Sequence, residues 1–283
     1  MLDFLLKPLE YDFFIRALVV GILSGFLCGV MGVYITTRRM SYVAHGLSHA
    51  ILGGAVISYI LGLNFYLGAG IWGFGAAILI QYLTVNNVYS DSAIGIVTTA
   101  SFALGVALIS MSRQFTQSFE AALFGNVLGV TPADVWIIVS VAIALLSLLF
   151  LFYRPLLFWS FDREIAQVHG VPVRWMDLLF ALMLAALLVS TLQVLGVTLI
   201  ISAVVIPASI ARLLTHHFAR MLAISSSVGA FVAFLGLYSS YYFDVASGAS
   251  VVLLSTAIFA GVLGFSISRQ KSRAVKSKLP LLK

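Results

Sequence analysis

Apolar runs of about 20 residues recur along the whole of this 283-residue chain. A helix of that length spans the roughly 30 Å hydrocarbon core of a bilayer. Only 9% of the residues are charged, whereas an ordinary soluble domain carries about 25%. The pattern therefore predicts an all-α, polytopic integral membrane protein in which residues 1–283 form a single transmembrane domain.

The apolar runs predict about eight or nine membrane helices. The run at 43–62 is polar at its start, and 175–213 can be divided in more than one way, so both counts stay open. The nine expected segments are 14–36, 43–62, 66–84, 93–112, 134–153, 175–191, 195–213, 221–240 and 248–268.

Lysine and arginine residues predict the orientation of the chain, because cytoplasmic loops of membrane proteins carry an excess of them. With a cytoplasmic C-terminus, only Arg113 among the basic residues beyond the first helix falls outside. The net charge of +6 then reflects topology and lipid headgroups, not nucleic-acid binding. The first segment shows no pattern of a removable signal peptide. The residues that this orientation places on the cytoplasmic side with the C-terminal tail are Arg154, Arg163, Arg174, Arg212 and Arg220 and, if there are nine segments, Arg38 and Arg39.

Small residues in the first segment predict close helix packing, although glycine is common in membrane helices in any case. Small residues on one face let membrane helices approach closely. The single cysteine, Cys28, excludes a disulfide framework or a cysteine-based zinc site within one chain. We expect it to be a small packing residue. The glycines that recur at helical spacing are Gly21, Gly25, Gly29 and Gly32.

Two histidines, His45 and His49, lie in the stretch MSYVAHGLSHAILGG at residues 40–54. Four residues apart on a helix, they share one face and can converge on one ion. The spacing is that of the zinc-binding H-E-x-x-H helix, but the catalytic glutamate is missing, which argues against hydrolysis. A helix-packing role and a ligand role are about equally compatible with the residues alone. The glycines at 46, 53 and 54 predict a locally weak helix that lines a pathway.

Three acidic residues lie near the ends of apolar runs. Asp91 is at a predicted helix start, where a cap or helix-dipole role is sufficient. Asp244 falls in a turn between the last two helices, where it meets an incoming cation or, as we favour, caps the turn. Asp134 is an ordinary helix-start acid. His216 and His217 follow a predicted helix end and are expected to be solvated there.

The segment SFDREIAQVHGVPV at 160–173 predicts a short helix outside the membrane. Asp162 is a suitable N-cap, and residues 163–168 can form two turns. Gly170 suits a left-handed stop, and Pro172 prevents continuation. The helix is a candidate docking surface, or simply an ordered loop. The chain has no G-x-x-x-x-G-K-[ST] motif, so any ATP that drives transport must bind another subunit.

Several motifs, in order and spacing, resemble the membrane permease subunits of the manganese/zinc/iron ABC importers, and together they cover nearly the whole chain. The resemblance implies a type II ABC-importer-like permease of a prokaryotic plasma membrane, working as a homodimer with a central path. The motifs are RRMSYVAHGLSHAILGG, SDSAIGIVTTASFALG, LFGNVLGVTPAD, FDREIAQVHGV, LGVTLIISAVVIPASIARLL and GLYSSYYFDVASGASVVLL.

The resemblance also implies partners. Two cytoplasmic subunits would bind and hydrolyse ATP, and an extracytoplasmic binding protein would deliver zinc, manganese or iron. The permease itself would be no enzyme and would hold no permanent cofactor. Residues 162–170 match the coupling-helix region that contacts the ATPase, which gives Asp162, Glu164 and Gly170 a coupling role.

The resemblance also implies roles for a few further positions. Pro207 matches the helix-breaking proline of the family, and a proline inside a helix frees a carbonyl and kinks the segment. With Asp91 and Asp244, it is expected along the pathway or gate. Gly53 and Ala246 stand where the family often has proline.

The metal site departs from the family pattern at His45. The family reads Gly-Asp-x-x-Ser-His-Ala, so His45 stands at its acidic ligand and His49 at its histidine. Manganese favours carboxylate oxygen, whereas two imidazoles suit zinc. We therefore expect His45 and His49 to be the metal residues, with preference shifted from manganese toward zinc.

Two other classes of protein are compatible with an apolar chain. A self-sufficient secondary transporter or channel would need coupling acids deep in its helices, whereas the acids singled out above lie near segment ends. An intramembrane metalloenzyme would need a general base near the histidine pair, and the sequence offers none there. The importer permease is the favoured interpretation.

Overall fold

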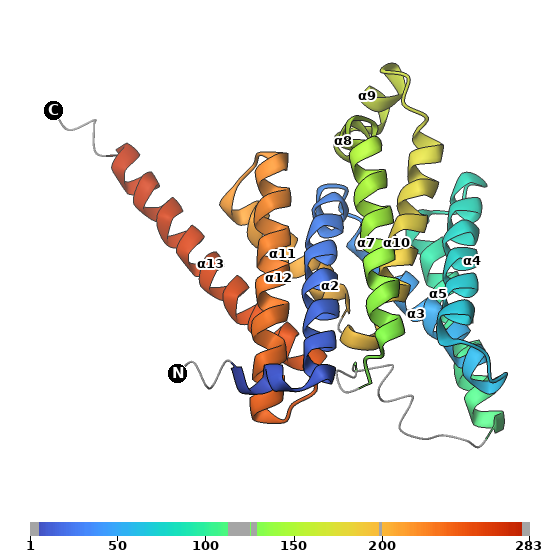
Figure 1. Ribbon diagram of the computed structural model, residues 1–283. Helices are drawn as coiled ribbons and strands as arrows, with labels where there is room; N and C mark the ends of the chain where they lie inside the picture. Colours follow the sequence, from blue (N-terminus) through green and yellow to red (C-terminus); the bar gives the residue numbers. More distant parts are fainter. Residues whose placement is uncertain (1–5, 113–124, 126–128, 198–199, 279–283) are drawn as a thin grey trace.

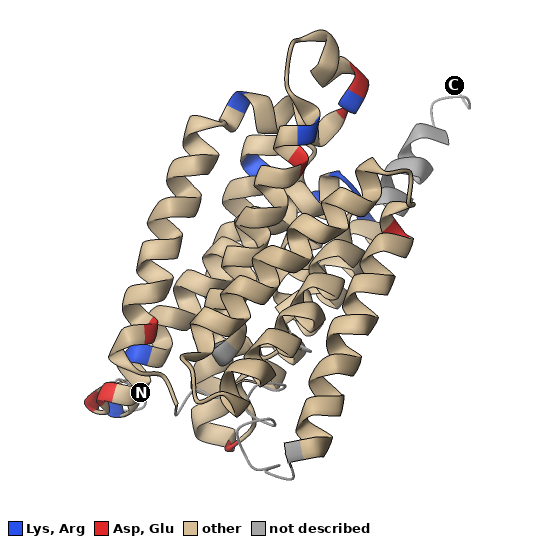
Figure 2. Cartoon of the chain, turned by 90° about the vertical axis from the view of Figure 1, so that its right-hand side faces the viewer, with Lys and Arg blue, Asp and Glu red and all other residues tan. Residues whose placement is uncertain are grey.

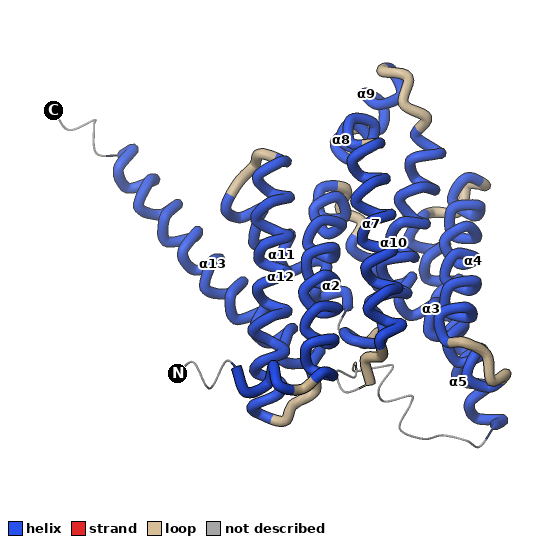
Figure 3. Tube along the Cα trace, in the orientation of Figure 1, coloured by secondary structure: helices blue, strands red, loops and turns tan. Residues whose placement is uncertain are grey.

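The computed structural model describes residues 6–112, 125, 129–197 and 200–278, and the regular structure in these ranges is entirely helical (Figure 3). Eight helices in these ranges are long and apolar enough to cross a membrane. The prediction of an all-α polytopic membrane protein is confirmed. The helices are η1 (Lys7–Glu10), α2 (Asp12–Thr37), α3 (Ser41–Ile60), α4 (Phe65–Val85), α5 (Ser90–Ser112), α7 (Pro132–Leu151), α8 (Tyr153–Phe161), α9 (Arg163–Val168), α10 (Val173–Leu195), α11 (Ile200–Leu214), α12 (Phe218–Phe243) and α13 (Ser247–Lys278).

The expected segment at 195–213 forms a shorter helix. α11 has 15 residues, which at 1.5 Å per residue gives about 22 Å, less than the hydrocarbon thickness. The run at 175–213 divides into two helices as expected, but the boundary lies a few residues later, because α10 continues to Leu195 and α11 begins at Ile200. Gly196 ends α10 with a φ of 73°, a conformation that glycine adopts without steric cost.

The bundle has two ends, and most of the arginines in the described ranges lie in segments at one of them. α8 and α9 lie at one end, here called the α9 end, with the α11–α12 junction at the same end (Figure 1). η1 and the start of α2 lie at the opposite end, and charged residues gather at both ends (Figure 2). Arg113 lies outside the described residues. Outside α13, the arginines in segments at the α9 end are Arg38, Arg39, Arg154, Arg163, Arg174, Arg212 and Arg220.

α2 packs closely against α12 through the glycines expected to serve this purpose. A Cβ added at Gly25 would lie 2.3 Å from the carbonyl oxygen of Gly229, so no larger residue fits without a shift of the backbone. The hydroxyl of Ser225 donates to the carbonyl oxygen of Gly29 at 2.6 Å. Cys28, between these glycines, is buried in the core as a packing residue. Close helix approach in the first segment is therefore confirmed.

α13 is far less covered by protein than α2. Its apolar window is 11% buried, against 72% for α2. Figure 1 shows α13 leaning away from the other helices toward the C-terminus. α2 is thus at the centre of the helix bundle, and α13 lies at its periphery.

Candidate functional site

The two histidines meet on α3 as their spacing predicted. The ring centroids of His45 and His49 are 4.7 Å apart, and the rings are nearly perpendicular, at 74°. Both side chains are half-buried. α3 runs without a break through both residues and through the glycines that follow, so the expected weakening of the helix is not found.

The glycines around the pair serve close packing instead. A Cβ added at Gly46 would lie 2.2 Å from the Cγ2 atom of Ile94 and 2.7 Å from the Oγ1 atom of Thr98, both on α5. One added at Gly53 would lie 2.5 Å from the carbonyl oxygen of Ser101. The absence of side chains at these positions brings α5 against the helix that carries the histidines.

A groove lies beside His45, between the start of α3 and α11. Its volume is about 380 Å³, and it is lined by Ser41, Tyr42, His45, Ile201, Ser202, Val205 and Ile206. The ring of His49 lies on the side of α5, with its centroid 5.8 Å from that of Phe102. The pair thus lies between α5 and the α11 groove.

The pair falls short of a complete metal site within one chain. In the described ranges, no three His, Cys, Asp or Glu side chains come close enough together to hold a metal ion. Zinc in proteins usually takes four ligands, and His45 with His49 offers two. The arrangement can therefore contact an ion transiently, or complete its coordination with groups from outside this chain.

The short capped helix predicted at 162–170 is present as α9. Asp162 accepts hydrogen bonds from the backbone N–H groups of Glu164 at 2.8 Å and Ile165 at 3.1 Å. Gly170 follows the helix with a φ of 74°. Glu164 is exposed in the first turn. The local prediction of start and stop is confirmed, because both depend on residues adjacent in sequence.

The pathway acids do not join the histidine pair. Asp91 is exposed in the first turn of α5, which begins at the α9 end. Asp244 is the C-cap of α12, with a left-handed φ of 52°. It therefore lies in the turn between the last two helices, as expected.

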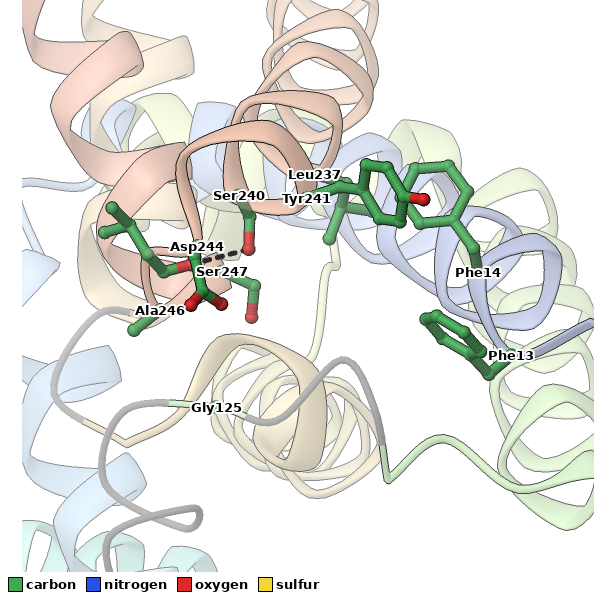
Figure 4. A pocket seen from close by; sticks show the side chains of 10 residues that line it. Phe13, Phe14, Gly125, Leu237, Ser240, Tyr241, Asp244, Ala246 and Ser247 are labelled. Atoms are coloured by element: carbon green, nitrogen blue, oxygen red, sulfur yellow. Dashed lines mark hydrogen bonds between the residues drawn. The ribbon is translucent and has the colours of Figure 1, made fainter. Parts of the chain in front are cut away.

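Asp244 lines a pocket of about 380 Å³ at the end opposite α9 (Figure 4). Asp244 and Ser247 line one side of the pocket, and Phe13 and Phe14 line the other (Figure 4). The hydroxyl of Ser240 donates to the carbonyl oxygen of Val245 at 2.6 Å, which closes the turn after α12.

Pro207 is buried inside α11, and the helix continues on both sides of it. The proline does not break the helix, although its missing N–H leaves one carbonyl in the preceding turn without a helical donor. Asp134 takes the third position of α7 and forms a capping box with Thr131. His216 and His217 are exposed between α11 and α12, as predicted.

One buried acid was missed in the sequence. Asp177 lies in the first turns of α10 with 8% of its surface exposed. It accepts hydrogen bonds from Trp159 on α8 at 2.8 Å and from Arg163 on α9, and it lies 3.5 Å from Arg38. The available signal was an acid inside the apolar run RWMDLLF, since such residues are costly in membrane segments unless they are paired.

Comparison with known proteins identifies the family to which this arrangement belongs. A model of the ABC 3 transport family matches residues 10–266. The manganese transport system membrane protein MntC of Listeria monocytogenes is 40% identical over 257 residues, which cover 90% of this chain and 91% of the relative. A Haemophilus influenzae protein named "Probable iron transport system membrane protein" is 33% identical, covering 94% of each chain.

A solved structure agrees with these relatives. PsaBC from Streptococcus pneumoniae in complex with Fab matches with a TM-score of 0.83 at 36% identity, covering 93% of this chain and 95% of that chain. The resemblance indicated by the sequence motifs is confirmed, and this chain belongs to the ABC 3 transport family.

Proposed function

We propose that this permease subunit of an ABC importer carries a divalent transition-metal ion, and that His45 and His49 contact the ion during its passage. The observation that carries the proposal is the imidazole pair, with ring centroids 4.7 Å apart beside the groove between α3 and α11. Imidazole nitrogen is a common ligand of first-row divalent ions.

Two copies of the chain would supply a fuller ligand set than one. The groove at His45 opens between two helices of a single protomer, and no third ligand from the described residues joins the pair. Two protomers that face each other here would present four imidazoles, the ligand number that zinc takes in structural sites. Neutral imidazoles carry no charge of their own, which favours binding weak enough for release.

The two ends of the bundle would meet different partners. The α9 end carries the excess of arginine that is typical of the cytoplasmic side, so the C-terminus of α13 would be cytoplasmic. One ATP-binding subunit would dock on α9 of each protomer, around Asp162, Glu164 and Gly170. An extracytoplasmic metal-binding protein would deliver the ion at the opposite end, where Asp244 lines a pocket.

Manganese is the first candidate cargo, because similar chains are named as manganese transport proteins. Zinc is the second candidate, and the His45 imidazole is the observation that favours it. Manganese prefers oxygen ligands, whereas imidazole suits zinc, whose affinity for most sites is the higher of the two. Iron is the cargo in the name of one relative.

The test uses the permease with its ATP-binding subunit and metal-binding protein, reconstituted in vesicles that take up radiolabelled manganese or zinc. His49→Ala should reduce ATP-dependent uptake of both ions by about 100-fold, since it removes one of two ligands. His217→Ala is the matched control, because it removes an exposed histidine away from the pair. Unchanged uptake in His49→Ala would contradict the proposal.

The choice between metals is tested by His45→Asp in the same vesicles. The change should raise the ratio of manganese to zinc uptake, because it restores a carboxylate oxygen beside His49. An equal ratio in both proteins would remove the selectivity hypothesis and leave the importer assignment standing. Uptake without ATP or without the ATP-binding subunit would support the alternative, a secondary transporter or channel.

A further inference from the structure

Asp177 connects three helices at the α9 end through a single carboxylate. Its Oδ1 atom accepts from the indole N–H of Trp159 on α8 at 2.8 Å, and its Oδ2 atom accepts from the guanidinium of Arg163 on α9. A second guanidinium, that of Arg38, lies 3.5 Å from Oδ1. Asp177 itself belongs to α10, and Trp159 is fully buried.

Arg38 is held by more than this ion pair. It donates to the carbonyl oxygen of Trp159 at 2.8 Å, and its guanidinium carbon lies 4.3 Å from the centre of the Trp159 ring. Burial lowers the pKa of the Arg38 guanidinium, and the Asp177 carboxylate acts in the opposite direction. The guanidinium therefore has a fixed position relative to α8 and α10.

Arg38 is also the C-cap residue of α2 and lies just before the helix that carries the histidines. The backbone N–H of Met40 donates to the carbonyl oxygen of Ile35 at 2.9 Å, which closes a tight turn around Arg39 in the left-handed region. α3 begins at Ser41. His45 follows after one turn of α3, so the Arg38 contact and the metal pair share one short stretch of backbone.

Arg163 connects the carboxylate of Asp177 to α9, because it is the first residue of that helix. Half of its side chain is exposed, whereas 11% of that of Arg38 is exposed. The contacts thus form a continuous series from α9 through Arg163, Asp177 and Arg38 to the start of α3. A displacement of α9 would therefore change the contact between Arg163 and Asp177 before it changes the contact between Asp177 and Arg38.

We infer that Asp177 is a positioning residue for transport, which transmits movement of α9 to the histidine-bearing helix through Arg38. The inference rests on the proposed function, since it gives α9 the ATPase contact and α3 the metal contact. The buried carboxylate is suited to this role because it contacts both guanidinium groups at once, so a change in one contact alters the charge that the other arginine meets.

The experiment uses the complete importer in vesicles and measures ATP hydrolysis and manganese uptake in the same sample. Arg163→Gln is the main variant, because it removes the α9 contact and leaves Asp177 paired with Arg38 and Trp159. We expect uptake to fall about tenfold while ATP hydrolysis stays within about twofold, so that more ATP is hydrolysed per ion transported. Arg174→Gln, an exposed arginine at the start of α10, is the matched control and should leave the ratio unchanged.

A second variant, Asp177→Asn, tests whether the carboxylate is the link between Arg163 and Arg38. Asp177→Asn should also raise the ratio of ATP hydrolysed to ions transported. Adding Arg163→Gln to it should have no further effect on this ratio, because both changes interrupt one series of contacts. Thermal unfolding and co-purification of the ATP-binding subunit are measured in parallel. If Asp177→Asn does not fold, the Arg163→Gln ratio alone decides.

Three outcomes would overturn the inference. These are an unchanged ratio in Arg163→Gln, loss of the ATP-binding subunit from that variant, and strictly additive effects in the double variant. The second outcome would assign Arg163 to the subunit interface instead. Failure of the unmodified importer to take up manganese or zinc would count against the proposed function, so the two failures are distinguishable.

Discussion

The two ends of the bundle each contain a buried carboxylate, but they compensate its charge differently. At the α9 end, Asp177 meets the guanidinium groups of Arg38 and Arg163. At the opposite end, Asp134 accepts from neutral groups: the hydroxyl of Tyr66 at 2.5 Å, and the backbone N–H and hydroxyl of Thr131. The difference indicates that the α9 end depends on ion pairing, whereas the opposite end depends on capping and hydrogen bonds.

The largest effect is expected at the α9 end. Arg38→Ala should lower the free energy of unfolding by about 3 to 5 kcal/mol, because it removes the buried cation beside Asp177. Unfolding of the purified permease by SDS in mixed micelles measures this. Arg39→Ala is the control, since Arg39 is exposed and adjacent. Similar losses in both variants would show that the cluster does not stabilise this end.

A smaller effect is expected from the neutral donor at the opposite end. Tyr66→Phe removes the hydrogen bond to Asp134 without changing the shape of the side chain, and should cost about 1.5 to 3 kcal/mol. The same unfolding titration measures it, with Tyr82→Phe on the exposed part of α4 as the control. A cost equal to that of Arg38→Ala would remove the contrast between the two ends.

The helix caps offer a matched comparison of still smaller size. Asp162→Ala and Thr131→Ala each remove an N-cap, which should cost about 1 kcal/mol. The consequences should differ, because α9 has 6 residues and α7 has 20. Hydrogen exchange should show local opening of α9 in Asp162→Ala, and a small loss of overall stability in Thr131→Ala. Protection of α9 in both variants would contradict this.

The smallest effect on stability is expected at Asp244. Asn tolerates the left-handed conformation that Asp244 adopts at the end of α12, so Asp244→Asn should change stability by less than about 0.5 kcal/mol. If its charge attracts incoming cations, uptake at low metal concentration should fall about threefold, with less effect at high salt. Unchanged uptake at low salt would restrict Asp244 to its capping role.

Local features of this fold could be predicted from the sequence. The limits of α9 follow from Asp162 and Gly170, which act on neighbouring backbone, and the histidine pair follows from helical spacing. The close contact of α2 with α12 was indicated by the glycine positions, although not the identity of its partner helix.

Features that depend on distant residues could not be predicted in this way. Arg38 and Trp159 are 121 residues apart in the chain, and no local pattern specifies that they meet around Asp177. The boundary between α10 and α11 was placed a few residues too early, because hydrophobicity continues up to Gly196, where the backbone conformation and not the composition ends the helix.

The packing of α2 on α12 has a consequence for how the protein is made. The partners Gly29 and Ser225 are 196 residues apart, and synthesis at about 5 to 20 residues per second separates their appearance by roughly 10 to 40 s. During that interval the glycine face of α2 has no α12 to cover it. α2 therefore waits in lipid, or against other helices, until α12 has been inserted.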